Sequence, residues 1–415
     1  MPQSAVLAVT AALALSAVGL LCIYATESDL AVPRYTVKQL ATLLGGALCG
    51  LVIVRLGFGW FARCAWVVVA LAVVALLPLA LARYVSFGEL IPNRRGAYRW
   101  IQLPGFQFQP SEFAKIAYIV GLAAYLRYRR NYRTLTGLLI PFIASAAPAI
   151  LILLEPNLGT TILMAPVLFI MLFAAGARTR HLTAILLISL CLAPIAWFGI
   201  RGYQRDRILG VLLQSESLRQ RIIDEPDKYR FLATPRQARQ WTVDDGMQLL
   251  RSKTALGSGG LTGEGWGRGT FIEYDFLPDR HNDFVFALIG HQWGLLGCLL
   301  VLAFYAIIVM AGMEIAAATT EPFARLLAVG VVALIASQVI INIGMTVGLM
   351  PITGMTLPFV SYGGSSLLTN CVAVALLVSV ARHRPYLLAN HPFEFDRPRD
   401  RSASVRPSPR YPAEP

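Results

Sequence analysis

The sequence predicts an all-α, polytopic membrane protein with about ten transmembrane helices and one long extracytoplasmic loop. Hydrophobic residues make up 56% of the 415 residues and charged residues only 14%, whereas soluble globular domains hold about 45–50% and about 25%. The apolar residues also form nearly uncharged runs of helix length, and one membrane-spanning helix needs about 20 residues. Ten such spans leave enough chain for loops and one sizeable segment outside the membrane.

The apolar runs place the predicted spans in chain order. They cover residues 5–25, 39–54, 64–82, 111–126, 135–154, 158–177 and 182–200, and then, after a long polar stretch, 284–313, 326–350 and 364–380. The span at 111–126 is interrupted by Glu112 and Lys115. The first run has neither a preceding Lys or Arg nor a small-residue cleavage site, so we interpret it as a retained span and not as a signal peptide.

Basic residues predict the orientation of these spans. If the N-terminus is cytoplasmic, the cytoplasmic loops and tail carry Arg55, Arg63, Arg127, Arg129, Arg130, Arg133, Arg178, Arg180, Arg325, Arg382, Arg384, Arg397, Arg399, Arg401, Arg406 and Arg410. The positive-inside rule therefore predicts a multi-pass protein with both termini in the cytoplasm. Because orientation accounts for this basic excess, the net charge of +13 needs no nucleic-acid partner.

The predicted domain organisation follows from the spans. Residues 1–390 form a transmembrane domain in which 201–283 is the large extracytoplasmic loop, with thirteen Lys or Arg against twelve Asp or Glu. Long loops of this kind cross a membrane largely regardless of charge. Residues 391–415 are rich in Pro, Arg and Ser, and this composition predicts a disordered cytoplasmic tail.

The cysteines and histidines predict no metal site. The six cysteines lie apart in apolar runs without a C-x-x-C pair, and the five histidines form no metal-binding motif. No cofactor is predicted with certainty, and a divalent cation is left open.

Ionisable residues at the edge of a span are costly and are candidates for function. In the segment 109–115, a proline suits the first helical turn, and Glu112 and Lys115 at i, i+3 share one helix face. One interpretation is a local ion pair that lets the helix begin at the interface. The other adds Arg99 and Trp100, whose charge and ring suit the phosphate of a lipid carrier at the outer face.

The second candidate is Asp283, the last acid before thirty residues without Asp, Glu, Lys or Arg. A carboxylate at a border between water and an apolar span can have its pKa raised by burial or lowered by Arg280, and either shift suits a general base. The alternative is a helix-terminal acid stabilised by the dipole. His281 is interpreted as an orienting or solvated residue.

Two further segments break the apolar pattern. Seven glycines between 257 and 269 either bring backbone N–H groups close to a ligand or form a flexible turn. Helix breakers and hydroxyls between 342 and 366, among them Ser365, either line a cavity or pack within the protein.

Taken in order, these segments resemble the SEDS family of bacterial cell-wall proteins, with more similarity to RodA than to FtsW. Five blocks carry the resemblance, and together they cover most of the chain between 99 and 366: 99–101 with 108–115, 155–160, 257–269, 278–286 and 342–366. The resemblance implies a ten-helix protein of the bacterial inner membrane. It also implies an inverting glycosyltransferase that polymerises lipid II during cell-wall synthesis beside a class B penicillin-binding protein.

The resemblance also implies roles for individual residues. Asp283 is the expected catalytic carboxylate, which deprotonates the sugar 4-hydroxyl of one lipid II so that it displaces undecaprenyl pyrophosphate from another. The resemblance also places Glu112 and Lys115 in the substrate site. From the residues themselves we expect substrate binding by Arg99, Trp100, Arg280, His281 and Ser365 as well. The Pro-Asp-Arg-His pattern ending at His281 favours a role in elongation and cell shape over division.

The chain departs from the family pattern at three acidic positions and in one loop. Asn157 replaces the usual Asp, His291 and Gln292 replace a pair of glutamates, and the segment 212–244 is longer than expected. The changes at Asn157, His291 and Gln292 keep open an inactive membrane scaffold for a penicillin-binding protein. The chief alternative to the polymerase is a lipid II flippase. A flippase needs polar groups at the midplane, whereas the candidate charges lie near the outer surface.

Overall fold

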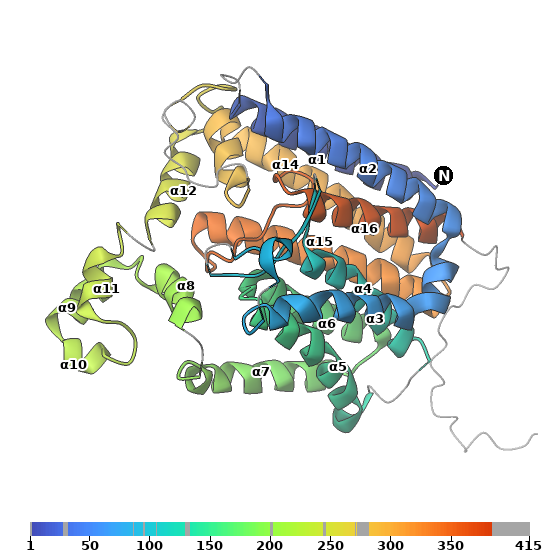
Figure 1. Ribbon diagram of the computed structural model, residues 1–415, viewed down its shortest axis with the longest axis horizontal. Coiled ribbons are helices and arrows are strands. Elements are labelled where there is room, and N and C mark those ends of the chain that lie inside the picture. The colour runs from blue at the N-terminus through green and yellow to red at the C-terminus, as the bar shows by residue number, and fades with distance from the viewer. Residues whose placement is uncertain are drawn as a thin grey trace, which may run out of the picture.

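The computed structural model describes residues 2–27, 32–85, 87–93, 96–104, 106–128, 133–199, 202–243, 246–269, 271 and 282–383. The fold class is confirmed, because the described chain is a helical bundle with a single short hairpin (Figure 1). The predicted disordered tail at 391–415 lies outside the described residues.

Each of the ten predicted spans corresponds to one helix of the bundle. Among the described residues, eight helices are long and apolar enough to cross a membrane: α1 (Gln3–Ala25), α2 (Arg34–Leu56), α3 (Phe58–Leu81), α5 (Leu135–Leu154), α6 (Leu158–Ala175), α14 (Val285–Ala317), α15 (Pro322–Val347) and α16 (Gly364–Arg382). The other two are α7 (Thr179–Ala196), a shorter apolar helix, and α4 (Pro110–Leu126), which carries Glu112 and Lys115.

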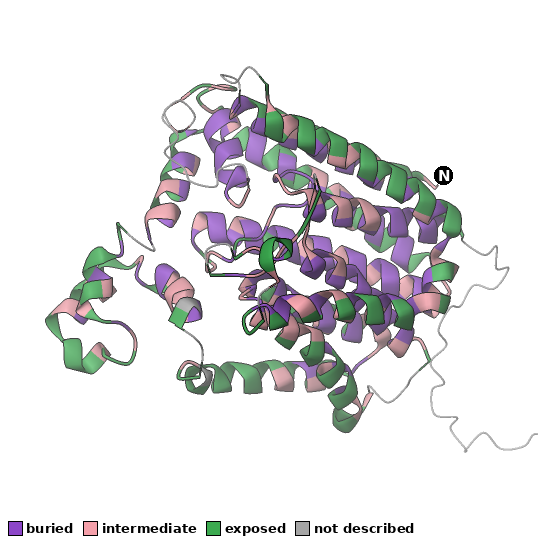
Figure 2. Cartoon of the chain, in the orientation of Figure 1, coloured by how far each residue is buried: buried purple, intermediate pink, exposed green. Residues whose placement is uncertain are grey.

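Burial divides the bundle into a protein-covered centre and outer helices. Most residues of α4, α15 and α16 are buried, while α2 and α7 expose long rows of apolar side chains such as Leu44, Leu48 and Leu190 (Figure 2). An outward apolar face and a packed interior are what a membrane-embedded bundle requires, because the lipid tails solvate the outer face.

The end of α16 lies against the start of α3. His383, which follows α16, packs its ring against Phe58 at the start of α3, with ring centroids 5.7 Å apart. Figure 1 places the N-terminal end of α1 at the end of the bundle away from α8–α11. The long loop and the N-terminus therefore occupy opposite ends of the bundle.

The long loop folds into helices of its own. These are α8 (Gly202–Leu212), α9 (Glu216–Asp224), α10 (Pro226–Tyr229), α11 (Pro235–Gln240) and α12 (Met247–Ser258). Around the 212–244 segment an apolar cluster gathers Leu209, Leu213, Ile222, Ala233, Ala238, Trp241 and Leu249. The Trp241 indole N–H also donates to the Gly210 carbonyl at 3.1 Å. This loop is therefore a small packed unit beside the bundle, while α12 packs against α14 and α15.

A short hairpin, which the sequence analysis did not predict, precedes α4. It consists of β1 (Ile101–Leu103) and β2 (Phe106–Phe108), with Ile101 opposite Phe108. Ser365 at the start of α16 accepts a hydrogen bond from the Gln109 N–H (3.0 Å) and donates one to the Gln107 carbonyl (2.9 Å). The hairpin and the first turn of α4 are thereby fixed against α16.

Candidate functional site

Glu112 and Lys115 form a buried ion pair in the first turns of α4. Their side chains lie 2.8 Å apart, and the residues are 7% and 4% exposed. The predicted shared face is therefore confirmed. The pair lies inside the protein, where breaking it by removing one partner costs several kcal/mol.

A polar network extends from this ion pair across two other helices. The Lys115 ammonium lies 3.5 Å from the side-chain oxygen of Gln338 on α15, and the amide nitrogen of Gln338 donates to the Thr356 carbonyl at 2.9 Å. The Thr356 hydroxyl in turn lies 2.7 Å from the Ser366 hydroxyl on α16. Gln338 is almost fully buried, so this network sets the position of the lysine side chain within the bundle.

Asp283 lies two residues before the start of α14 and is half-buried. Its backbone carbonyl accepts a hydrogen bond of 3.0 Å from the side-chain amide of Asn342 on α15, and the same amide donates to the Met355 carbonyl at 2.6 Å. A Cβ atom placed on Gly354 would lie 3.4 Å from a carboxylate oxygen of Asp283. The carboxylate therefore faces the non-helical segment between α15 and α16.

Gln338 and Asn342 bring the two sequence motifs to one place. They lie four residues apart on α15, and side chains at i, i+4 lie on the same helix face about 5–6 Å apart. One contacts Lys115 and the other holds the backbone of Asp283. Two candidate sites that are 168 residues apart in the sequence thus meet on one face of α15. The sequence analysis did not predict a role for Gln338. The feature that could have identified this residue is a polar side chain within an apolar span.

The segment that follows α15 is packed within the protein. Besides the amides of Asn342 and Gln338, the Ser361 hydroxyl accepts from the Leu357 N–H at 2.7 Å. Gln39 on α2 donates to the Ser361 carbonyl at 3.1 Å and accepts from the Gly363 N–H at 3.3 Å. Side-chain amides and hydroxyls thus satisfy non-helical backbone in the bundle, as a membrane interior requires. The packing interpretation of this segment is confirmed.

The 155–160 block forms the turn between α5 and α6. Asn157 accepts from the Thr160 N–H at 3.3 Å and donates to the Ser111 hydroxyl at 3.0 Å, so it caps α6 and ties it to the start of α4. An ionised aspartate could accept the first bond but could not donate the second. The side chain of Asn157, which stands in place of the usual Asp, therefore has a structural role in joining α6 to α4.

Glu155 in this turn is a buried acid that the sequence analysis missed. It is 1% exposed, and its carboxyl oxygens have no hydrogen-bond partner within the described part of the chain. Burial raises the pKa of Glu155 to about 9, although the nearby charge of Arg99 opposes the shift. The carboxyl group is therefore protonated at neutral pH.

The remaining predicted substrate-binding residues take different positions. Arg99 donates to the backbone carbonyls of Glu155 and Pro156, and Trp100 is half-buried directly before β1. The Ser365 hydroxyl uses its hydrogen bonds on the backbone of the hairpin segment. Arg280 and His281 lie outside the described residues. A substrate contact by any of these residues stays a prediction.

The backbone of the glycine-rich block forms hydrogen bonds with α14 at a point where that helix is interrupted. At Gly294 the backbone leaves the helical conformation (φ 63°, ψ −160°). The N–H groups of Leu295 and Leu296, which would normally bond to His291 and Gln292, instead donate to the carbonyls of Gly260 and Leu261. The freed carbonyls of His291 and Gln292 accept from the N–H groups of Glu264 and Gly265 at 2.9 and 3.1 Å.

The two replaced glutamate positions take part in this junction. The His291 ring nitrogen Nδ1 lies 2.8 Å from the Ser258 hydroxyl, and the Gln292 side-chain oxygen accepts from the Gly267 N–H at 3.3 Å. The backbone N–H groups of the glycine block are thus bonded to α14. The N–H groups of Glu264, Gly265 and Gly267 are therefore not available to a ligand, and the interpretation that the block binds a ligand is not supported at these residues.

Among the described residues, no three His, Cys, Asp or Glu side chains gather closely enough to hold a metal ion.

Comparison with known proteins assigns the family. The model of the FtsW/RodA/SpoVE family, described as "Cell cycle protein", matches residues 5–386. The peptidoglycan glycosyltransferase MrdB of Escherichia coli K12 is 35% identical over 303 residues, which cover 73% of this chain and 75% of that protein. A probable peptidoglycan glycosyltransferase FtsW of Geobacter sulfurreducens is 36% identical over 292 residues, covering 69% and 70%.

A solved structure shares the fold. It is described as "Structural coordination of polymerization and crosslinking by a peptidoglycan synthase complex" and superposes with a TM-score of 0.71 at 24% identity, covering 91% of this chain and 98% of the other. Taken with the family match over nearly the whole bundle, these similarities show that the chain belongs to the FtsW/RodA/SpoVE family of cell cycle proteins.

Proposed function

We infer that the chain is a peptidoglycan glycosyltransferase that polymerises lipid II into glycan strands. The observation that carries this proposal is the meeting of Asp283 and Lys115 on one face of α15, through Asn342 and Gln338. The names of the relatives from Escherichia coli and Geobacter sulfurreducens support the same activity.

In the proposed mechanism the Asp283 carboxylate takes the proton of the sugar 4-hydroxyl of one lipid II molecule. The hydroxyl oxygen then bonds to the anomeric carbon of a second lipid II, and the bond from that carbon to the diphosphate oxygen breaks. The electron pair leaves with undecaprenyl pyrophosphate, and attack from the opposite side inverts the configuration from α to β. A positioned general base contributes about 10²–10⁴-fold to such a step.

Positive groups are proposed to stabilise the charge that develops on the leaving diphosphate. Lys115, Arg99 and Arg280 are the proposed cations. If a divalent cation takes part, we propose that it arrives bound to the substrate diphosphate. Titrating MgCl₂ into protein treated with a chelator, with lipid II as substrate, tests this part of the proposal.

The proposed setting is the bacterial inner membrane, with both termini in the cytoplasm. The opposite placement of the N-terminus and the long loop supports this orientation. We propose residues 1–390 as the transmembrane domain and a class B penicillin-binding protein as the partner. The solved complex that couples polymerisation and crosslinking supports the partner. A role in elongation rests on the sequence pattern that ends at His281.

A polymerisation assay separates this function from its alternatives. Purified full-length protein is incubated in detergent with labelled lipid II, with and without the partner, and the products are separated by size. We expect glycan polymer from the wild type, none from Asp283→Asn, and normal polymer from the control Asp227→Asn on the exposed helix α10. A flippase or an inactive scaffold forms no polymer in detergent, so absence of polymer from the wild type with its partner would refute the proposal.

A further inference from the structure

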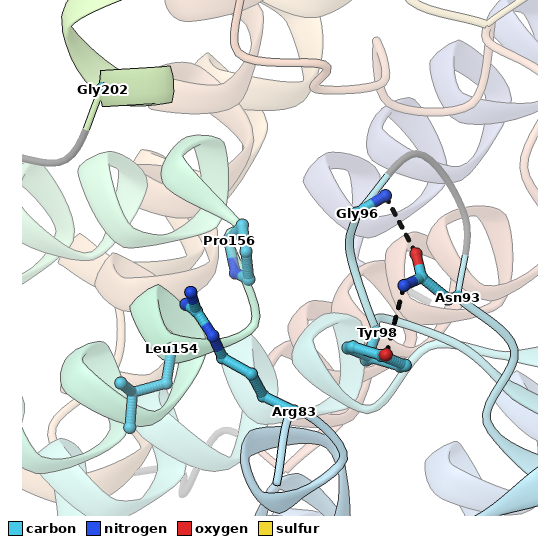
Figure 3. A pocket seen from close by; sticks show the side chains of 7 residues that line it. All are labelled: Arg83, Asn93, Gly96, Tyr98, Leu154, Pro156 and Gly202. Carbon is cyan, nitrogen blue, oxygen red and sulfur yellow. Dashed lines mark hydrogen bonds between the residues drawn. The ribbon is translucent and has the colours of Figure 1, made fainter. Parts of the chain in front are cut away.

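A separate cavity lies outside the network around α15. Its volume is about 660 Å³, and it is lined by Arg83, Asn93, Gly96, Tyr98, Leu154 and Pro156, with Gly202 at its edge (Figure 3). These residues come from the segment after α3, the end of α5 with the turn that follows it, and the first residue of α8. The cavity thus lies where several connections meet at the loop end of the bundle.

Arg83 gives this cavity a positive charge without a compensating group. Its side chain is exposed and extends toward Leu154 and Pro156 (Figure 3). No acidic or carbonyl partner contacts its guanidinium within the described ranges. In contrast, the charge of Lys115 is balanced by Glu112, and Arg99 is bonded to two backbone carbonyls. Among the described residues that line the cavity, Arg83 is therefore a cation available to an anion.

The rest of the cavity wall suits a phosphate group with an apolar extension. Asn93 accepts from the Gly96 N–H at 2.9 Å and donates to the Tyr98 hydroxyl at 3.1 Å. The Tyr98 hydroxyl keeps its own proton for a further acceptor. Gly202 begins α8 and lines the cavity, so the positive end of the helix dipole lies beside it. Leu154 and Pro156 supply apolar wall.

We propose that this cavity binds the diphosphate of a polyprenyl-linked lipid, at a site separate from Asp283. The proposal rests on the proposed polymerase function, because joining two lipid-linked sugars requires two diphosphate groups to be held at once. The planar guanidinium of Arg83 pairs with the phosphate oxygens in a bidentate manner, and the first isoprene units contact Leu154 and Pro156.

Photo-crosslinking tests the site independently of turnover. Full-length protein in detergent is labelled with a diazirine analogue of farnesyl diphosphate, and the labelled peptides are mapped by mass spectrometry. We expect labelling of the peptides that contain residues 83–98 and 151–156. Arg83→Ala should reduce this labelling at least tenfold and Arg83→Lys by less, whereas the control Arg63→Ala, near the other end of α3, should leave it unchanged. Equal labelling of wild type and Arg83→Ala would overturn the proposal.

Competition identifies the source of the phosphate. Unlabelled farnesyl diphosphate should compete at least tenfold better than inorganic diphosphate, farnesol or phosphatidylglycerol. Equal competition by inorganic diphosphate would assign the cavity to a soluble anion, and equal competition by phosphatidylglycerol would assign it to anionic lipids in general. Either result overturns the assignment to a polyprenyl diphosphate.

The variant Asp283→Asn shows whether a negative result contradicts the cavity proposal or the proposed polymerase function. This variant should keep the labelling that depends on Arg83 while losing polymerisation. Continued polymerisation with normal labelling contradicts only the catalytic assignment. Because Arg83 is exposed and forms no hydrogen bond or ion pair with the described residues, Arg83→Ala should also keep the thermal unfolding temperature of the wild type, which excludes misfolding as the cause of lost labelling.

Discussion

The side-chain amide of Asn342 donates a hydrogen bond of 3.0 Å to the backbone carbonyl of Asp283. Through its second bond, to Met355, the same amide joins the start of α14 to the segment that follows α15. Asn342 is fully buried, so its geometry is fixed by packing. It is a positioning residue for the Asp283 carboxylate, because it holds the backbone from which that carboxylate extends.

Asn342→Ala should therefore lower kcat for lipid II polymerisation while leaving KM within about twofold. Loss of the amide removes its hydrogen bonds to the carbonyls of Asp283 and Met355, and a hydrogen-bond partner lost from a buried group costs about 1–3 kcal/mol. Steady-state kinetics and thermal unfolding in detergent measure both effects. Ser379→Ala is the matched control, since it removes a buried hydroxyl that has no partner in the described structure. Parallel changes of kcat and KM would argue against positioning.

Removal of Lys115 alone should destabilise the protein more than removal of both members of its ion pair. Lys115→Met leaves Glu112 buried without its counter-charge, and such changes cost about 3–5 kcal/mol. The double variant Glu112→Gln/Lys115→Met should regain most of the lost unfolding temperature. If Lys115 also contacts phosphate, the double variant should keep a raised KM for lipid II. A normal KM in this stable variant would exclude substrate binding by Lys115.

Alanine substitutions in the glycine-rich block should distinguish glycines that pack against α14 from glycines that have open space around them. At Gly263 (φ 82°) a Cβ atom would lie 2.2 Å from the Gln292 carbonyl oxygen, whereas at Gly257 it would meet nothing within 4 Å. We expect Gly263→Ala to cost at least about 1–3 kcal/mol of unfolding free energy and Gly257→Ala to be neutral or slightly stabilising. Thermal unfolding of both variants measures this difference, and equal behaviour would contradict the bonded junction with α14.

The stability of the protein should depend on pH through Glu155. Its pKa rises from 4.5 to about 9 on folding, so the folded state holds a proton that the unfolded state releases. The resulting loss of stability begins above the unfolded value and grows until the pH reaches about 9. Glu155→Gln should therefore unfold at a higher temperature than the wild type, by a margin that increases between pH 5 and pH 9. A constant margin across this range would contradict a buried neutral carboxyl.

The sequence predicted the spans well because lipid imposes long apolar runs that few other structures share. It also predicted the pairing of Glu112 and Lys115, since helical spacing alone places them on one face. The meeting of Lys115 and Asp283 on α15 could not be predicted, because it depends on how α4, α14 and α15 pack. The break at Gly294 could not be predicted either, because single glycines are common in transmembrane helices. The burial of Glu155 could not be predicted, because it follows from tertiary contacts.

The position of α4 has a consequence for biogenesis. This helix is surrounded by α3, α6, α15 and α16, and it carries two charged residues in 17. Protein contacts, more than lipid, compensate its polar side chains, and two of the helices that supply these contacts are synthesised some 200 residues later. Assembly of the candidate site is therefore a late event, completed only after the last two helices have entered the membrane. A ribosome-stalled chain that ends before α15 should leave α4 accessible to water-soluble thiol reagents at an introduced cysteine.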